Sequence, residues 1–102
     1  MKNLVIVIPA GAQQNVADAL RAVAQLQGFT FTHVEGHGSQ VENDPFLSAR
    51  DKVVGYTPWV RVDILLEDTD VDTVLTALRA TQHGLAGQGV YWVTTVEKSG
   101  RF

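Results

Sequence analysis

The sequence predicts an α+β fold in which one four-stranded antiparallel sheet carries two helices on the same face. Three observations predict it. Four segments have the composition or the period-two alternation of β-strands, two segments carry apolar residues at helical spacing, and they follow one another as strand, helix, strand, strand, helix, strand. This order is the βαββαβ arrangement, in which both helices cover one face of the sheet.

The first strand and the first helix are predicted between residues 2 and 27. The strand is Lys2–Pro9 (KNLVIVIP), whose β-branched and aliphatic residues occupy both faces, as is typical of a central or doubly covered strand. The next apolar residues recur at spacings of four, three and three, which puts them on one stripe of a helix. They are Val16, Leu20, Val23 and Leu26. We expect this helix to span 13–27 and to end at Gly28, because glycine is favoured at the C′ position.

The second strand is followed by a long loop. Residues 29–34 (FTFTHV) alternate with period two, which predicts a strand that runs into Gly36-His37-Gly38. The 36–57 segment is polar, and its one predicted helical turn, over 48–53, is short. Loops of this length are usually functional or mobile.

The third strand, over 58–67 (PWVRVDILLE), separates two kinds of side chain by its period of two. One face carries Val60, Val62, Ile64 and Leu66, and the other carries Trp59, Arg61, Asp63 and Leu65. The first face is predicted to belong to the core, and the second is mixed.

The second helix is predicted to begin at a Thr69–Asp72 capping box. Its core face is Val71, Val74, Leu75 and Leu78. The helix runs out at 82–84, a glycine-rich turn continues to Gly89, and the β-forming residues 90–97 (VYWVTTVE) make the last strand. The tail, 98–102, is short and expected to be mobile.

Together these elements predict a ferredoxin-like fold with one bare sheet face. Trp59, Leu65, Tyr91 and Val93 are expected to leave apolar area on that face. Monomers seldom expose large apolar patches, so we expect a homo-oligomer that buries it. Trp59 and Trp92 are assigned to core or subunit packing rather than to stacking on a base.

The amino-acid composition limits the classes of function that this chain can have. The chain has 102 residues and a mass of 11.1 kDa, which predicts a single domain over 1–102. Its 8 basic and 11 acidic residues give a formal charge of −3, so there is no basic face for nucleic acid. The absence of cysteine excludes disulfides, thiolate metal sites and a cysteine nucleophile, and it fits a reducing cytosol. The longest apolar run near the N-terminus, 4–10, is far shorter than the roughly 18 residues of a membrane span, so we expect a cytoplasmic protein that does not cross the membrane.

Four features, which together cover nearly the whole chain, resemble the PII signal-transduction superfamily. Residues 34–40 (VEGHGSQ) match the V-x-G-x-G motif that ends the second strand of PII proteins, and the segment to Thr57 takes the place of their T-loop. Residues 84–89 (GLAGQG) have the G-x-x-G-x-G spacing of their B-loop. Residues 47–55, 91–93 and 97–100 look like the small, poorly characterised PII-like branch that often accompanies heavy-metal efflux genes.

The resemblance implies a homotrimer whose clefts between adjacent subunits hold a small effector, usually an adenine nucleotide. The 40–57 loop would relay occupancy to a partner, often a membrane transporter. The ligand-binding residues expected on this basis are Gly36, His37, Gly38, Ser39, Gln40, Gly84, Gly87, Gln88, Gly89, Lys98 and Arg101. Glycines in the 84–89 turn also permit positive φ, so that successive N–H groups can converge on an anion. PII proteins usually carry a lysine where this chain has Val90, which favours a monophosphate, a diphosphate or another small anion over a triphosphate.

Two other functions stay open. His33, His37 and His83 would lie near one cleft in the PII fold, and neutral imidazole is a common ligand of Zn, Cu or Ni. The alternative is therefore a metal-binding accessory or sensor of a heavy-metal efflux system. A small ferredoxin-like enzyme, with His37 as a base, is the third hypothesis. The sequence carries neither a nucleophile–base signature nor a converging carboxylate pair, so we expect a regulatory protein and not an enzyme.

Overall fold

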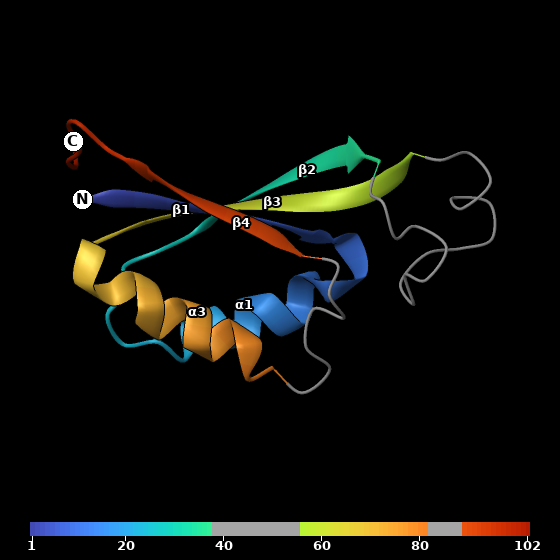
Figure 1. Cartoon of the computed structure of the whole chain (residues 1–102), viewed down its shortest axis with the longest axis horizontal. Coiled ribbons are helices and arrows are strands. Elements are labelled where there is room, and N and C mark those ends of the chain that lie inside the picture. Colours follow the sequence, from blue (N-terminus) through green and yellow to red (C-terminus); the bar gives the residue numbers. More distant parts are fainter. Residues whose placement is uncertain (38–55, 82–88) are drawn as a thin grey trace.

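The computed structural model describes residues 1–37, 56–81 and 89–102, which form one antiparallel sheet backed by two helices (Figure 1). The strands lie in the order β2-β3-β1-β4. The elements are β1 (Lys2–Pro9), α1 (Gln13–Arg21), β2 (Thr30–Gly36), β3 (Thr57–Leu66), α3 (Val71–Arg79) and β4 (Val90–Thr95). The predicted ferredoxin-like α+β fold class is confirmed.

β1 lies at the centre of the sheet, as its apolar residues on both faces predicted. It pairs antiparallel with β3 over its whole length and with β4 over residues 2–7. Ile6, for example, lies opposite Val62 on one side and Tyr91 on the other. β2 pairs with β3, so β2 and β4 form the two edges.

The core lies between the sheet and the helices. α1 and α3 both lie on one side of the sheet (Figure 1), and their apolar stripes face it. The fully buried aliphatic side chains of this layer are Leu4, Ile6, Ile8, Val16, Leu20, Val60, Val62, Ile64 and Val74. Full burial of such a side chain contributes about 1.5–3 kcal/mol, so this layer fixes the helices on the sheet. The alternation predicted for β3 is confirmed, since Val60, Val62, Ile64 and Leu66 all belong to this core.

α1 is shorter than its apolar stripe predicted, because it ends at Arg21 and not at residue 27. Val23 and Leu26 still pack on the core, but two tighter turns lead to them. In these turns Val23 N–H donates to Leu20 O (3.1 Å) and Leu26 N–H donates to Val23 O (3.2 Å). Apolar spacings of three suit i→i+3 turns as well as an α-helix, so spacing alone does not fix where the helix ends.

α3 begins without the predicted Thr69–Asp72 capping box. The chain enters the helix through a 3-10 turn, Asp68–Asp70, and the N-cap residue Asp70 makes no side-chain capping hydrogen bond. Its N–H donates instead to the Glu67 carbonyl at 2.9 Å, so a backbone turn replaces the box. Of the predicted core face, Val74, Leu75 and Leu78 are buried, and Val71 is partly buried against the core.

The strand positions that point away from the helices form a surface that we call the open face. Alternation along β1, β3 and β4 puts Leu65, Val90 and Trp92 there, and these side chains are 52%, 56% and 42% exposed. Trp59 also belongs to this face but is only 8% exposed. The predicted apolar character of the face is therefore present, and Trp59 is a packing residue as expected.

The prediction was wrong for two residues of β4. Tyr91 and Val93 lie opposite Ile6 and Leu4, so they point to the helix side of the sheet. Both remain exposed at this edge. The composition of the strand predicted its existence, whereas the face of each residue depends on its register against β1.

The predicted helical turn over 48–53 and the glycine-rich segment 84–88 lie outside the described residues. Within the part of the chain that is described, no helix is both long and apolar enough to cross a membrane.

Candidate functional site

The predicted ligand-binding residues that the structure describes lie at two opposite ends of the sheet. Gly36 ends β2 opposite Thr57, and His37 follows it. Gly89 precedes β4, whose first residue pairs with Val7 at the same end of the sheet. β2 and β4 are the two edge strands, so Gly36 and Gly89 are about three strand spacings, roughly 14 Å, apart across the sheet, and their registers also offset them along the strands.

Lys98 and Arg101 lie at the other end, beyond the last residue of β4. The chain there runs beside the N-terminus, since Val96 N–H donates to Met1 O at 3.1 Å. Both termini lie at this end of the sheet (Figure 1). A single chain therefore does not bring Arg101 together with Gly36.

The remaining predicted site residues lie outside the described part of the chain. They are Gly38, Ser39, Gln40, His83, Gly84, Gly87 and Gln88.

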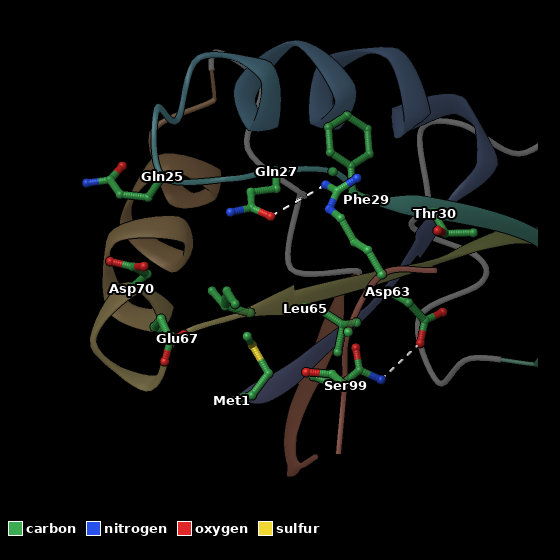
Figure 2. A pocket seen from close by; sticks show the side chains of 15 residues that line it. Met1, Gln25, Gln27, Phe29, Thr30, Asp63, Leu65, Glu67, Asp70 and Ser99 are labelled. Carbon is green, nitrogen blue, oxygen red and sulfur yellow. Dashed lines mark hydrogen bonds between the residues drawn. The ribbon is translucent and has the colours of Figure 1, made fainter. Parts of the chain in front are cut away.

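A pocket of about 670 Å³ lies at the end of the sheet that carries Arg101. It is built from the turn after α1, the start of β2, the end of β3 and the C-terminal tail. Figure 2 shows Gln25, Gln27 and Phe29 on one side of it, with Met1 and Ser99 across from them. The C-terminal tail forms part of the wall through Ser99, Gly100 and Arg101.

Sequence reasoning anticipated Arg101 and missed the rest of this pocket. The lining residues come from segments far apart in the chain, and none of those segments carries a motif that would group them. Gly28 was interpreted as a helix end, yet it lies in the wall directly before Phe29. The available signal was that Gly28 directly precedes the predicted strand at residue 29, which indicates that it lies in the connection to that strand.

The charges of the pocket are predominantly acidic. Asp63, Glu67 and Asp70 line it, against the single guanidinium of Arg101. Arg101 Nη2 donates a long hydrogen bond to Gln27 Oε1 at 3.5 Å, which leaves its other donors for a ligand. An anionic group entering here would gain most from lying against Arg101, because Glu67 and Asp70 repel it where they line the pocket.

Asp63 is a pocket carboxylate that accepts hydrogen bonds from two other side chains of the protein. Arg61 Nε donates to Asp63 Oδ2 and Arg61 Nη2 donates to Asp63 Oδ1, both at 3.1 Å, and Asn3 Nδ2 donates to the same Oδ1 at 3.2 Å. The hydrogen bond from Arg61 is the main reason that the pKa of Asp63 lies below its ordinary value, and desolvation opposes it. The same hydrogen bond raises the pKa of Arg61. Asp63 is therefore an acceptor already occupied by the protein, unlike a free acid or base.

The two described histidines do not form one ligand set. His33 lies within β2 and His37 just beyond its end, so four extended residues, roughly 13 Å, separate them along the chain. Among residues 1–37, 56–81 and 89–102 there is no group of three His, Cys, Asp or Glu side chains that could hold a metal ion. The predicted metal set would thus need His83, which is outside the described residues.

Comparison with known proteins identifies relatives along the whole chain. The profile of DUF3240, described as a protein of unknown function, matches residues 1–102. The chain is 33% identical over 99 residues to the nitrogen regulatory protein P-II of Rhizobium meliloti (strain 1021), which covers 96% of this chain and 88% of the relative. It is 32% identical over 99 residues to nitrogen regulatory protein P-II 2 of Methanothermobacter thermautotrophicus, with 96% and 85% covered.

A solved structure agrees with the fold. The crystal structure of a DUF3240 family protein from Shewanella baltica matches with a TM-score of 0.76, covering 99% of this chain and 94% of that one at 18% identity. The predicted resemblance to PII proteins is confirmed by the sequence relatives. The chain therefore belongs to the DUF3240 family and is a homologue of the P-II nitrogen regulatory proteins.

Proposed function

We propose that this chain is a trimeric regulatory protein of the cytoplasm that binds a small anionic effector, such as an adenine nucleotide, in clefts between adjacent subunits. The 40–57 segment relays effector binding to a partner, and a membrane transporter or efflux component is the partner class that we propose. The curated relatives named above are regulatory proteins, which supports regulation rather than catalysis.

One observation carries the proposal of a site between subunits. Arg101 lies in the pocket at one end of the sheet, whereas Gly36 and Gly89 lie at the opposite end. If all of these residues bind one effector, the two ends must come from different copies of the chain. A site divided in this way also couples effector binding to the assembly, because each half is supplied by another subunit.

The acidic lining of the pocket narrows the effector class. A ligand seated there presents one compact anionic group to Arg101 and hydrogen-bond donors to Glu67 and Asp70. A triphosphate fits this charge pattern less well than a monophosphate or a diphosphate, because the additional negative charges would face carboxylates.

Thermal unfolding of the purified protein tests the proposal. We would measure it with AMP, ADP, ATP, cyclic AMP and bicarbonate, and in separate samples with Zn²⁺, Cu²⁺ and Ni²⁺. A ligand present at a hundred times its Kd adds about 2.7 kcal/mol to the stability of the folded state, which raises the unfolding midpoint by several degrees. We expect such a shift with a nucleotide.

The variant Arg101→Gln should lose most of that shift. Its matched control is Arg21→Gln, which removes an exposed guanidinium that pairs with Asp18 on α1 at 3.6 Å, far from the pocket lining. An unchanged shift in Arg101→Gln would remove Arg101 from the site. A response to metal ions alone would favour the histidine alternative, and silence with every compound would contradict effector binding.

A further inference from the structure

Two carboxylates of the pocket beside Arg101 are left uncommitted by the chain itself. Glu67 and Asp70 both line this pocket, and within the described residues neither side chain makes a hydrogen bond or an ion pair. Asp70 occupies the N-cap position of α3, yet its carboxylate does not cap the helix. Asp63 differs, because its two oxygens already accept hydrogen bonds from other side chains. Glu67 and Asp70 are therefore the pocket carboxylates that can accept from a ligand.

The pocket also holds a positive charge that these two carboxylates do not neutralise. The guanidinium of Arg101 carries several N–H donors, and one of them makes a long hydrogen bond of 3.5 Å to Gln27 Oε1. In the described part of the chain, Arg101 forms no ion pair with Glu67 or Asp70. Figure 2 shows Glu67 and Asp70 on one side of the pocket and Gln27, the partner of Arg101, nearer its middle. One cavity therefore carries separated charges of both signs.

Apolar side chains contribute to the rest of the wall. Met1 is 44% exposed and Phe29 is partly buried against the core, and both line the pocket. The burial of apolar surface is favourable, whereas the burial of a charge without a partner is costly. A ligand whose charged groups are joined by methylene groups therefore matches both the apolar and the charged parts of this wall.

We propose that the pocket binds a small zwitterion, with an ammonium or guanidinium group against Glu67 and Asp70 and a carboxylate or phosphate against Arg101. The proposal rests on the proposed function, because it uses the same pocket, and it adds a positive charge to the effector. A purely anionic ligand would face the two carboxylates with the wrong charge, and a purely cationic ligand would leave Arg101 without an anion. Amino acids with a basic side chain are the ligand class with this chemistry.

Isothermal titration calorimetry of the wild-type protein with three probes of similar length tests the charge pattern. 6-Aminohexanoate carries both charges, hexylamine carries only the ammonium group, and hexanoate carries only the carboxylate. We expect 6-aminohexanoate to bind about tenfold more tightly, or better, than either of the other probes, since each of these loses a charge-assisted hydrogen bond. Equal binding of all three probes, or of 6-aminohexanoate and hexanoate, would contradict the zwitterion.

The double variant Glu67→Gln/Asp70→Asn tests which residues hold the cationic group. It removes both negative charges but keeps an oxygen acceptor at each position, so its affinity for 6-aminohexanoate should fall about tenfold or more, while its affinity for hexanoate should not fall. Asp68→Asn is the matched control, because residue 68 lies between the two in sequence but outside the pocket lining, and it should bind as the wild type does. Circular dichroism establishes that the double variant is folded, and Glu67→Gln alone replaces it if it is not.

AMP, titrated in parallel, separates this proposal from the proposed function. Binding of AMP without binding of 6-aminohexanoate overturns the zwitterion and keeps an anionic effector. Binding of 6-aminohexanoate without AMP supports the zwitterion and replaces the nucleotide as the effector. Binding of 6-aminohexanoate that the double variant leaves unchanged overturns the assignment to Glu67 and Asp70. Silence with both compounds contradicts the zwitterion and counts against an effector in this pocket.

Discussion

Gly36 ends β2 directly against the side chain of Trp59, and this contact explains why a glycine stands there. A Cβ atom at residue 36 would lie 3.1 Å from Trp59 Cδ1 and 3.3 Å from Nε1. Trp59 is buried, so its ring has little room to withdraw. The glycine that was predicted to contact a ligand thus has a packing role in the isolated chain, at the end of β2.

Gly36→Ala should therefore destabilise the fold. We expect a loss of about 1–3 kcal/mol in the free energy of unfolding, because overpacking a buried site forces its neighbours to shift. Urea unfolding followed by tryptophan fluorescence measures it. Gly28→Ala is the matched control, since a Cβ there meets nothing within 4 Å, and its effect should stay within about 0.5 kcal/mol. Equal stability of the two variants would contradict the close contact.

At the scale of elements, α1 shows that a helix and its apolar stripe need not end together. The helix stops at Arg21, while Val23 beyond it is 9% exposed and belongs to the core. Helix length is decided by backbone hydrogen bonds, whereas the stripe is decided by what faces the sheet. The two tighter turns after Arg21 keep Val23 on the core without continuing the helix.

Val23→Ala should consequently behave as a core substitution although residue 23 lies outside the helix. We expect a loss of about 1–3 kcal/mol in unfolding free energy, from lost burial and the cavity left behind. The exposed neighbour Gln25 provides the control, because Gln25→Ala should change stability by less than about 0.5 kcal/mol. Urea unfolding monitored by circular dichroism compares the two, and a Val23→Ala protein as stable as wild type would show that this turn is not packed on the core.

The strands could be predicted closely because their residues have a high β-propensity and also form a recognisable pattern of apolar positions. β1 was predicted over Lys2–Pro9 and is observed over the same residues, and β3 is displaced by one residue from its predicted range. In β4 the aromatic and β-branched residues predicted a strand but not its faces, since VYWV is apolar throughout. Period two separates faces only where polar and apolar residues alternate, and Tyr91 therefore had to be placed by its pairing with Ile6.

At the scale of the whole molecule, the candidate site could be predicted only where a motif lies within one segment. The V-x-G-x-G and G-x-x-G-x-G patterns are local, so the sequence indicated Gly36 and Gly89. The pocket beside Arg101 joins residues that are distant in the sequence, such as Met1, Gln27 and Ser99. Their proximity is a product of the antiparallel sheet, which returns the C-terminal tail to the start of β1.

The open face also leads us to expect that the whole molecule associates with copies of itself in solution. Leu65 is 52% exposed on it, and a large aliphatic side chain so placed gains from burial against another copy. A lysine at this position would replace an aliphatic side chain with a strongly hydrated charge inside that contact. Leu65→Lys should therefore shift the wild-type species, which we expect at three times the chain mass, towards monomers and raise the apparent dissociation constant on the order of 100-fold.

Sedimentation velocity over a concentration series measures that shift. Thr73→Lys is the control, since it adds the same charge at an exposed position of α3 on the opposite layer, and it should sediment as the wild type does. Leu65 also lines the pocket, so the readout is molecular mass and not ligand binding. Dissociation by both variants would mean that net charge alone governs assembly. Dissociation by Leu65→Lys alone locates the contact on the open face, because the two variants then differ only in which layer of the molecule carries the new charge.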